Sequence, residues 1–147
     1  MERMDEHRRR QAEAFDAIQQ GKQYVYRRTF TDGDVAMFCG VTGDFNPYHQ
    51  DDIFAAASPF GRRIVPGLLT ASMLTHIGGL LAFLATDMHF EFLAGVCVGD
   101  TVTCTVTFTG RDGARRRLTG EASCVNQDGV EVLRGTFSGR PGPSRLA

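Results

Sequence analysis

The stretch 101–109 constrains the fold more than any other part of this sequence, because apolar and threonine residues alternate along it without a break. The apolar positions are Val102, Cys104, Val106 and Phe108, and the intervening positions are Thr101, Thr103, Thr105, Thr107 and Thr109. Successive side chains of a β-strand point to opposite faces. The pattern therefore predicts a strand with one face packed on a core and a threonine face that meets water or another subunit.

Turn signals and further apolar runs predict four more strands around it. Asp112-Gly113 and Asp128-Gly129 are hairpin signals, which makes 115–126 and 130–137 the next two strands. Residues 24–30 have strand composition. The remaining predicted strand, expected to be half-buried, is the alternation of Met88, Phe90 and Phe92 with His89 and Glu91. Five strands, the last three in a meander, fit an antiparallel sheet.

The longest apolar segment is 66–85, and as one helix it would span roughly 30 Å, which is enough to cross a membrane. We reject a membrane helix because the segment contains Thr70, Ser72, Thr75 and His76, and the flanking regions show no second span or anchor. A helix that is apolar all round is instead expected to be buried inside a wrapping sheet. Gly78-Gly79 either lets the sheet approach closely or marks where the helix bends or ends early.

The sequence divides into an arm, one domain and a tail. Residues 1–23 predict a charged, mostly exposed helix or a frayed arm that Gly21 stops. Residues 24–138 are expected to form the domain, with short helices after the N-cap residue Thr31 and over 51–57. The tail 139–147 is rich in Gly, Pro and Ser and is expected to be disordered.

Composition excludes several classes of protein. The chain has 147 residues, which suffices for one domain with a core, and a formal net charge of −1, so its overall charge makes no case for nucleic-acid binding. Arginines cluster at 8–10, 62–63 and 115–117, and each cluster could meet phosphates. For the first and third clusters a solvated face is the favoured interpretation.

Cysteine and histidine spacing argues against a metal site. The four cysteines (Cys39, Cys97, Cys104 and Cys124) form no C-x-x-C pair, and the histidines show no ligand spacing with them. Apolar neighbours suggest buried thiols in a reducing compartment. The N-terminus begins with charged residues rather than an apolar stretch, so we expect a cytoplasmic protein.

The loop 43–49 concentrates residues that can do chemistry. Asp44, Asn46, Pro47 and His49 lie within six residues, and Pro47 stiffens the loop. A carboxylate and an imidazole on a stiff loop can face each other across a gap that holds a water, with one group taking its proton and the other supplying one. On spacing alone, a structural role is an equal alternative, in which Asp44 caps a turn and His49 begins a helix.

This region resembles the MaoC-like hydratase/dehydratase family, whose best-known members are R-specific enoyl-CoA hydratases. The motif is D-x-N-P-x-H-x-D, then an alanine-rich helix, F-x-x-x-I-V-x-G and a long apolar helix. Here its positions are Asp44, Asn46, Pro47, His49, Asp51, Ala55, Phe60, Ile64, Val65 and Gly67. The likeness covers 24–138, and the family usually has His-Gly where this chain has Pro66-Gly67. It implies an α+β hot-dog fold, an antiparallel five-stranded sheet wrapped around a long central helix.

The resemblance also implies site residues. Asp44 and His49 are the expected catalytic pair, and the Gly67 amide is the expected oxyanion donor. Asn46 is expected to orient the loop and the water. Arg62 or Arg63 could pair with a phosphate of a coenzyme A or phosphopantetheine arm. The implied reaction is (R)-specific hydration of trans-2-enoyl thioesters and its reversal, without a cofactor, in a homodimer.

Alternative interpretations remain for function and for other polar residues. The same chemistry could serve carrier-protein-bound chains, and a non-catalytic acyl-thioester-binding protein is the rival that Pro66 favours. A hot-dog thioesterase is disfavoured because 67–86 contains no acidic residue. We expect His76 to be a core histidine bonded to the backbone and His89 to face solvent. Asp51-Asp52 is expected to serve the first turn of its helix.

Overall fold

Strand β3 (Thr101–Asp112) forms where the alternation predicts it. Its four apolar side chains are buried, and the threonines between them are partly or fully exposed, so the predicted two-faced strand is confirmed. β4 (Arg117–Val125) and β5 (Glu131–Arg140) follow through the two Asp-Gly turns, and both pairings are antiparallel. The predicted meander is therefore confirmed.

The computed structural model describes residues 1–143. The elements before β3 are α1 (Glu2–Ala17), β1 (Gln23–Thr29), α2 (Asp32–Thr42), α3 (Pro47–Gln50), α4 (Asp52–Ala56), α5 (Gly67–Ala71), α6 (Met73–Leu80) and β2 (Leu84–Phe92). The strands form one five-stranded sheet in the order β1-β3-β4-β5-β2. Every neighbouring pair in it is antiparallel, as predicted.

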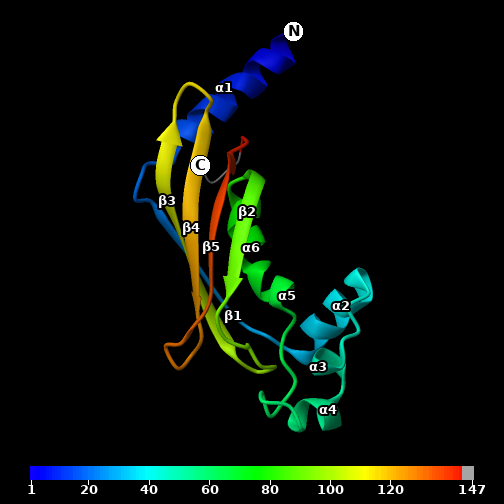
Figure 1. Cartoon of the computed structure of the whole chain (residues 1–147). Helices are drawn as coiled ribbons and strands as arrows, with labels where there is room; N and C mark the ends of the chain where they lie inside the picture. Colours follow the sequence, from blue (N-terminus) through cyan, green and yellow to red (C-terminus); the bar gives the residue numbers. More distant parts are fainter. Residues whose placement is uncertain (144–147) are drawn as a thin grey trace.

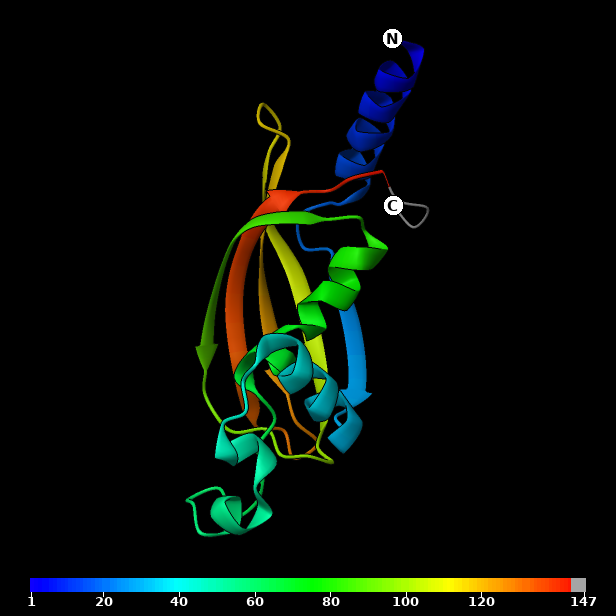
Figure 2. The ribbon, with the colours of Figure 1, turned by 90° about the vertical axis from the view of Figure 1, so that its right-hand side faces the viewer.

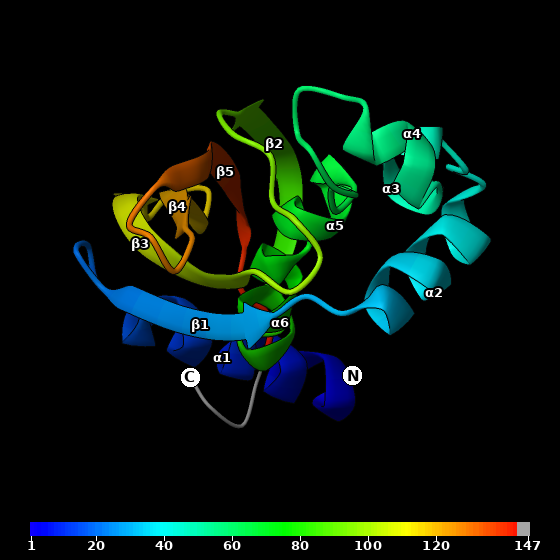
Figure 3. The same ribbon diagram turned by 90° about the horizontal axis from the view of Figure 1, so that it is seen from below.

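The sheet curves around α5 and α6, which lie in its concave face (Figures 2 and 3). The core fills the space between them and joins Leu69, Met73 and Ile77 of the helices to inward-facing strand residues such as Phe108 and Leu133. This is the hot-dog arrangement. The short helices α2, α3 and α4 lie beside the beginning of α5, at one end of the sheet, and α1 lies at the other end (Figure 1).

The central helix ends early, which is one of the outcomes that the sequence left open for Gly78-Gly79, and it is broken once. It begins at Gly67, is interrupted at Ser72 and ends at Leu80 rather than at residue 85. Gly78-Gly79 lies in its last turn, where two weak helix formers in succession favour termination, and Ala82 reverses the chain with a φ of 48°. Within residues 1–143, no helix combines the length and the apolarity needed to cross a bilayer.

Two other predictions are corrected at the edges of the fold. β2 is an edge strand and is mostly exposed rather than half-buried, with Met88 44% and Phe92 53% exposed. The tail prediction is wrong for 139–143, because β5 continues to Arg140 and the Gly142 N–H donates to the Ala82 carbonyl at 2.9 Å. Residues 144–147 of the predicted tail lie outside the described residues.

The predicted N-terminal helix forms, and its last turn is anchored to the sheet. Phe15 and Ile18 are buried, while most of the preceding turns are exposed. Arg111 of β3 donates to the Phe15 and Ile18 carbonyls, and its guanidinium lies 4.2 Å from the Phe15 ring centroid. An arginine that satisfies the last carbonyls of a helix stabilises its end.

The predicted N-cap of α2 is a complete capping box. The Asp34 N–H donates to Thr31 Oγ1, and the Thr31 N–H donates to Asp34 Oδ2 at 2.8 Å. The other oxygen of Asp34 lies 2.5 Å from the Arg28 guanidinium. Burial raises the pKa of Asp34, but the hydrogen bonds from Thr31 and Arg28 outweigh it, so that the pKa lies below its usual range.

Because the pKa of Asp34 is lower in the folded than in the unfolded protein, the ionised carboxylate stabilises the fold above about pH 4. This contribution is lost as the pH falls through the folded pKa. We expect Asp34→Asn to lower the free energy of unfolding by about 0.5–2 kcal/mol at neutral pH, and the difference from wild type to shrink in acid. Urea denaturation at neutral and acid pH measures both, with Asp5→Asn in exposed α1 as the control. A difference that does not change with pH would contradict the assignment.

Candidate active site

The loop between α2 and α3 is held by a series of local hydrogen bonds. Gly43 ends α2 in the left-handed conformation, with a φ of 75°. Asp44 Oδ1 then accepts from the Asn46 N–H at 3.3 Å, and Asn46 caps α3 by accepting from the Tyr48 N–H at 3.2 Å. Pro47 occupies the first position of α3. The structural alternative is thus correct for Asp44, which caps the turn, but not for His49, which is the third residue of α3 rather than its first. The cap leaves Asp44 Oδ2 free to face His49.

His49 is held in one tautomer. Its side chain is buried, and Nδ1 lies 2.7 Å from the Ile64 carbonyl. A carbonyl oxygen only accepts hydrogen bonds, so Nδ1 carries the proton, and Nε2 of the neutral ring is an acceptor. Nε2 lies 3.6 Å from Asp44 Oδ2. A carboxylate oxygen and an unprotonated nitrogen at this distance are both acceptors, and a water can donate to the two of them.

Gly67 and His49 line the same small cavity. Gly67 is the first residue of α5, where a backbone N–H has no partner within the helix. The cavity measures about 380 Å³ and is lined by His49, Phe60, Ile64, Val65, Gly67, Thr70, Phe92, Leu93, Ala94, Gly95, Val96 and Val132. Its lining is apolar apart from His49, Thr70 and backbone groups. It can therefore hold an apolar chain with one polar end near His49 and Gly67.

The structure separates the two arginines of the predicted phosphate site. Arg63 is mostly buried, and its guanidinium lies 2.5 Å from both Asp32 and Asp52. It also donates to the His49 carbonyl at 3.5 Å. With two carboxylate partners, Arg63 acts as a clamp between helices, and its geometry gives no support to a phosphate role. The Arg62 side chain is 59% exposed, although one of its nitrogens binds Asp100 at 3.0 Å.

The other polar residues considered from the sequence have structural or surface roles. Asp51 caps α4 by accepting from the Phe54 N–H at 2.9 Å, as predicted, and His89 is exposed, as predicted. The prediction for His76 is wrong: it is exposed and stacks on the Tyr26 ring, with centroids 3.9 Å apart. One face of α6 is exposed to solvent. In a segment that is almost wholly apolar, the spacing of apolar residues does not show which face this is.

Sequence reasoning missed the residues that support the site from other parts of the chain. Val132 and Phe92 line the cavity, and the Ile64 carbonyl orients His49. A main-chain acceptor leaves no trace in residue type. Asp100 is a buried carboxylate. Its place between the apolar stretch that ends at Val98-Gly99 and the alternating strand that begins at Thr101 was the available sign of a buried charge.

Comparison with known proteins shows the family of this chain. The family model for the MaoC-like domain matches residues 13–128. The chain belongs to this family. An (R)-specific enoyl-CoA hydratase of Rhodospirillum rubrum is 30% identical over 115 residues, which cover 76% of this chain and 80% of that protein. A 3-hydroxybutyryl-CoA dehydratase of Methylorubrum extorquens is 30% identical over 125 residues, which cover 81% of this chain and 77% of that protein.

A solved structure extends the likeness to three dimensions. The (R)-hydratase of A. caviae involved in PHA biosynthesis superposes with a TM-score of 0.81 and is 29% identical in sequence. The match covers 84% of this chain and 97% of that one. The α+β hot-dog fold expected from the motif in this MaoC-like protein is therefore confirmed.

The contact between Gly67 and Phe92 gives a test of how tightly this site is packed. A Cβ at position 67 would lie 2.8 Å from the Phe92 ring, which is closer than non-bonded carbons approach. Alanine is otherwise the better helix residue, by roughly 0.5–1 kcal/mol in a helix interior and by less at a first position such as this one. We therefore expect Gly67→Ala to destabilise the wild-type protein by about 1 kcal/mol but to be neutral or stabilising in a Phe92→Ala background. Denaturant unfolding of the four proteins measures the change of sign. Equal effects in both backgrounds would show that the ring does not restrict position 67.

Proposed function

We propose that this protein reversibly adds water to trans-2-enoyl thioesters and forms (R)-3-hydroxyacyl thioesters. The observation that carries the proposal is the 3.6 Å gap between Asp44 Oδ2 and His49 Nε2, with the Gly67 amide on the same cavity as His49. The family membership and the names of the relatives support the same reaction. The reverse reaction is the dehydration named for the Methylorubrum extorquens relative.

The proposed mechanism uses only groups of this chain and one water. The water donates its two hydrogen bonds to Asp44 and His49, which aligns an oxygen lone pair with the β-carbon of the substrate. As the C–O bond forms, the pair takes one proton from the water and passes that proton to the α-carbon, so that the elements of one water are added and the pair returns to its starting state. The negative charge that develops on the thioester oxygen is stabilised by the Gly67 N–H at the start of α5. No metal or redox cofactor takes part in these steps.

The surroundings suggest how each part of the substrate is held. The acyl chain enters the apolar cavity, and Asn46 keeps the 43–49 loop in its reactive shape through its cap of α3. Arg62, with its exposed guanidinium, is the candidate for a phosphate of coenzyme A or phosphopantetheine. Arg63 supports His49 instead of the substrate. A carrier-protein-bound substrate is the alternative to a coenzyme A thioester.

We further propose a cytoplasmic homodimer that serves fatty acid metabolism. β2 is an edge strand that carries exposed apolar side chains, with Leu84 70% and Met88 44% exposed, and such an edge favours pairing with a second copy. The four cysteines, three of them buried, are all free thiols, which suits a reducing compartment.

The catalytic pair makes the first prediction for activity. Asp44→Asn and His49→Ala should each slow hydration by roughly 10²–10⁴-fold, because each removes one of the groups that hold and deprotonate the water. The double variant should lose little more than the worse single one, since the two act on the same water. Loss of the enoyl-thioester absorbance with crotonyl-CoA and longer enoyl-CoAs measures the rate. His76→Ala is the control, and near-normal turnover in a folded Asp44 or His49 variant would contradict the mechanism.

A second prediction concerns the oligomeric state of the protein. Light scattering should give about twice the monomer mass of 16.1 kDa. Met88→Arg on the outer edge strand β2 should shift the protein toward the monomer, because a charge on an edge strand opposes pairing. The matched control is Val25→Arg on β1, the other edge of the sheet, where Val25 is 64% exposed. A fully active wild-type monomer, or equal effects of the two substitutions, would rule out β2 as the interface.

A further inference from the structure

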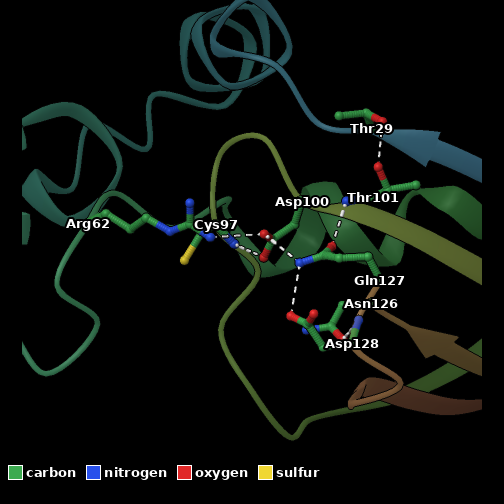
Figure 4. A network of polar contacts seen from close by, with 8 residues as sticks. All are labelled: Thr29, Arg62, Cys97, Asp100, Thr101, Asn126, Gln127 and Asp128. Atoms are coloured by element: carbon green, nitrogen blue, oxygen red, sulfur yellow. Dashed lines mark hydrogen bonds and ion pairs between the residues drawn. The ribbon is translucent and has the colours of Figure 1, made fainter.

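Asp100 is a buried carboxylate for which the proposed mechanism has no direct use. It lies immediately before β3, with its side chain only 7% exposed. Three donors from different parts of the chain surround it (Figure 4). Arg62 Nη2 and Gln127 Nε2 donate to Oδ1 at 3.0 and 3.1 Å, and the Cys97 N–H donates to Oδ2 at 2.8 Å. A buried carboxylate with this many donors is stable only as long as all of them stay in place.

The three donors come from three different connections, and the first two of these border the cavity. Arg62 belongs to the segment between α4 and α5, Cys97 to the loop between β2 and β3, and Gln127 to the turn between β4 and β5. The backbone of Asp100 extends the network, because its carbonyl accepts from the Phe30 N–H at 3.0 Å and so ties the end of β1 to it. Displacement of this one carboxylate therefore releases three segments together.

Two of these segments pair directly with each other. Ile64 and Cys97 form an isolated antiparallel bridge. On either side of it, the Val65 N–H donates to the Val96 carbonyl at 2.7 Å and the Val98 N–H donates to the Arg63 carbonyl at 3.3 Å. The position of residues 63–65 is thus set by their pairing with residues 96–98. Asp100 holds the 96–98 segment through the Cys97 N–H and the other segment through Arg62.

The same short segment carries the groups that prepare the catalytic pair. The Ile64 carbonyl fixes the proton of His49 on Nδ1. Gly67 follows two residues after Val65 and begins α5. A shift of 63–65 would therefore release the His49 tautomer and move the Gly67 amide at the same time.

We propose that Asp100 is a positioning residue for the hydration reaction: it pins the 96–98 and 62–65 segments together, so that the Ile64 carbonyl keeps His49 protonated on Nδ1 and Gly67 stays at the cavity. The catalytic part of this statement rests on the proposed function. The structural part, that Asp100 controls the tautomer of His49, does not.

The central test reads the tautomer and needs no enzymatic activity. In protein labelled with ¹⁵N histidine at about pH 8.5, where a free imidazole is neutral, His49 should show a protonated Nδ1 and an unprotonated Nε2. Its signals are identified by their loss in His49→Gln. Asp100→Asn retains the size of the side chain but places an amide donor against the surrounding donors. This variant should remain folded and show a mixture of both tautomers. An unchanged His49 signal in folded Asp100→Asn would overturn the proposal.

Two further variants separate positioning from loss of stability. Gln127→Ala removes one donor to the same carboxylate and should shift the tautomer in the same direction to a smaller extent, even if Asp100→Asn fails to fold. Arg111→Gln detaches the last turn of α1 at the other end of the sheet, and so destabilises the protein without touching this network. It should leave the His49 signals unchanged. A tautomer change in Arg111→Gln as large as that in Gln127→Ala would show that general destabilisation is the cause, and the proposal would fail.

Kinetics then test the catalytic consequence. Asp100→Asn should lower kcat by about 10- to 100-fold, the range expected when reacting groups are misplaced by about an ångström, and leave KM within about threefold. If wild-type protein hydrates no enoyl thioester, the proposed function fails while the tautomer result still stands. If the tautomer changes but kcat does not, the positioning role is refuted although the reaction is confirmed.

Discussion

Packing of α5 and α6 into the concave face of the sheet is the interaction on which the rest of this structure depends. The inward-facing residues of β3, β4 and β5 share one core with Leu69, Met73 and Ile77 of these helices. Once this layer forms, the start of α5 has a defined position at one end of the sheet. Gly67 and its N–H are therefore placed in part by this apolar packing, since Gly67 is the first residue of α5.

The proposed catalytic pair, Asp44 and His49, is instead positioned by local hydrogen bonds and then fixed by a contact from a more distant segment. The cap of α3 by Asn46 and the turn at Asp44 follow from residues that are neighbours in sequence. This local structure brings Asp44 and His49 together, but it does not choose which imidazole nitrogen carries the proton. The Ile64 carbonyl makes that choice. Whether His49 Nε2 can accept a hydrogen bond beside Asp44 Oδ2 therefore depends on Ile64, which lies in the segment between α4 and α5.

The two adjacent arginines show why residue type alone is a weak guide to role. Arg62 and Arg63 are equivalent candidates for a phosphate in the sequence. In the structure Arg63 joins Asp32 of α2 to Asp52 of α4 and contacts the His49 backbone, whereas Arg62 is exposed and bonds Asp100. An arginine next to two carboxylates is held by them, because a planar guanidinium offers several donors in fixed directions. Only the positions of those carboxylates distinguish the two residues.

Much of the fold and part of the site could be predicted from the sequence because they rest on local rules. The threonine alternation, the two Asp-Gly turns, the Thr31 cap and the loop at 44–49 all depend on residues within a few positions of each other. Gly78-Gly79 indicated a possible end of the central helix, but the sequence could not choose between that and a close approach of the sheet. The exposure of β2 was not predictable in this way, because its position at the sheet edge depends on the order of all five strands. Tertiary structure alone decided the tautomer of His49 and the role of Asp100, because both depend on pairing between 63–65 and 96–98, which lie far apart in the chain and meet only after the sheet has folded around its helix.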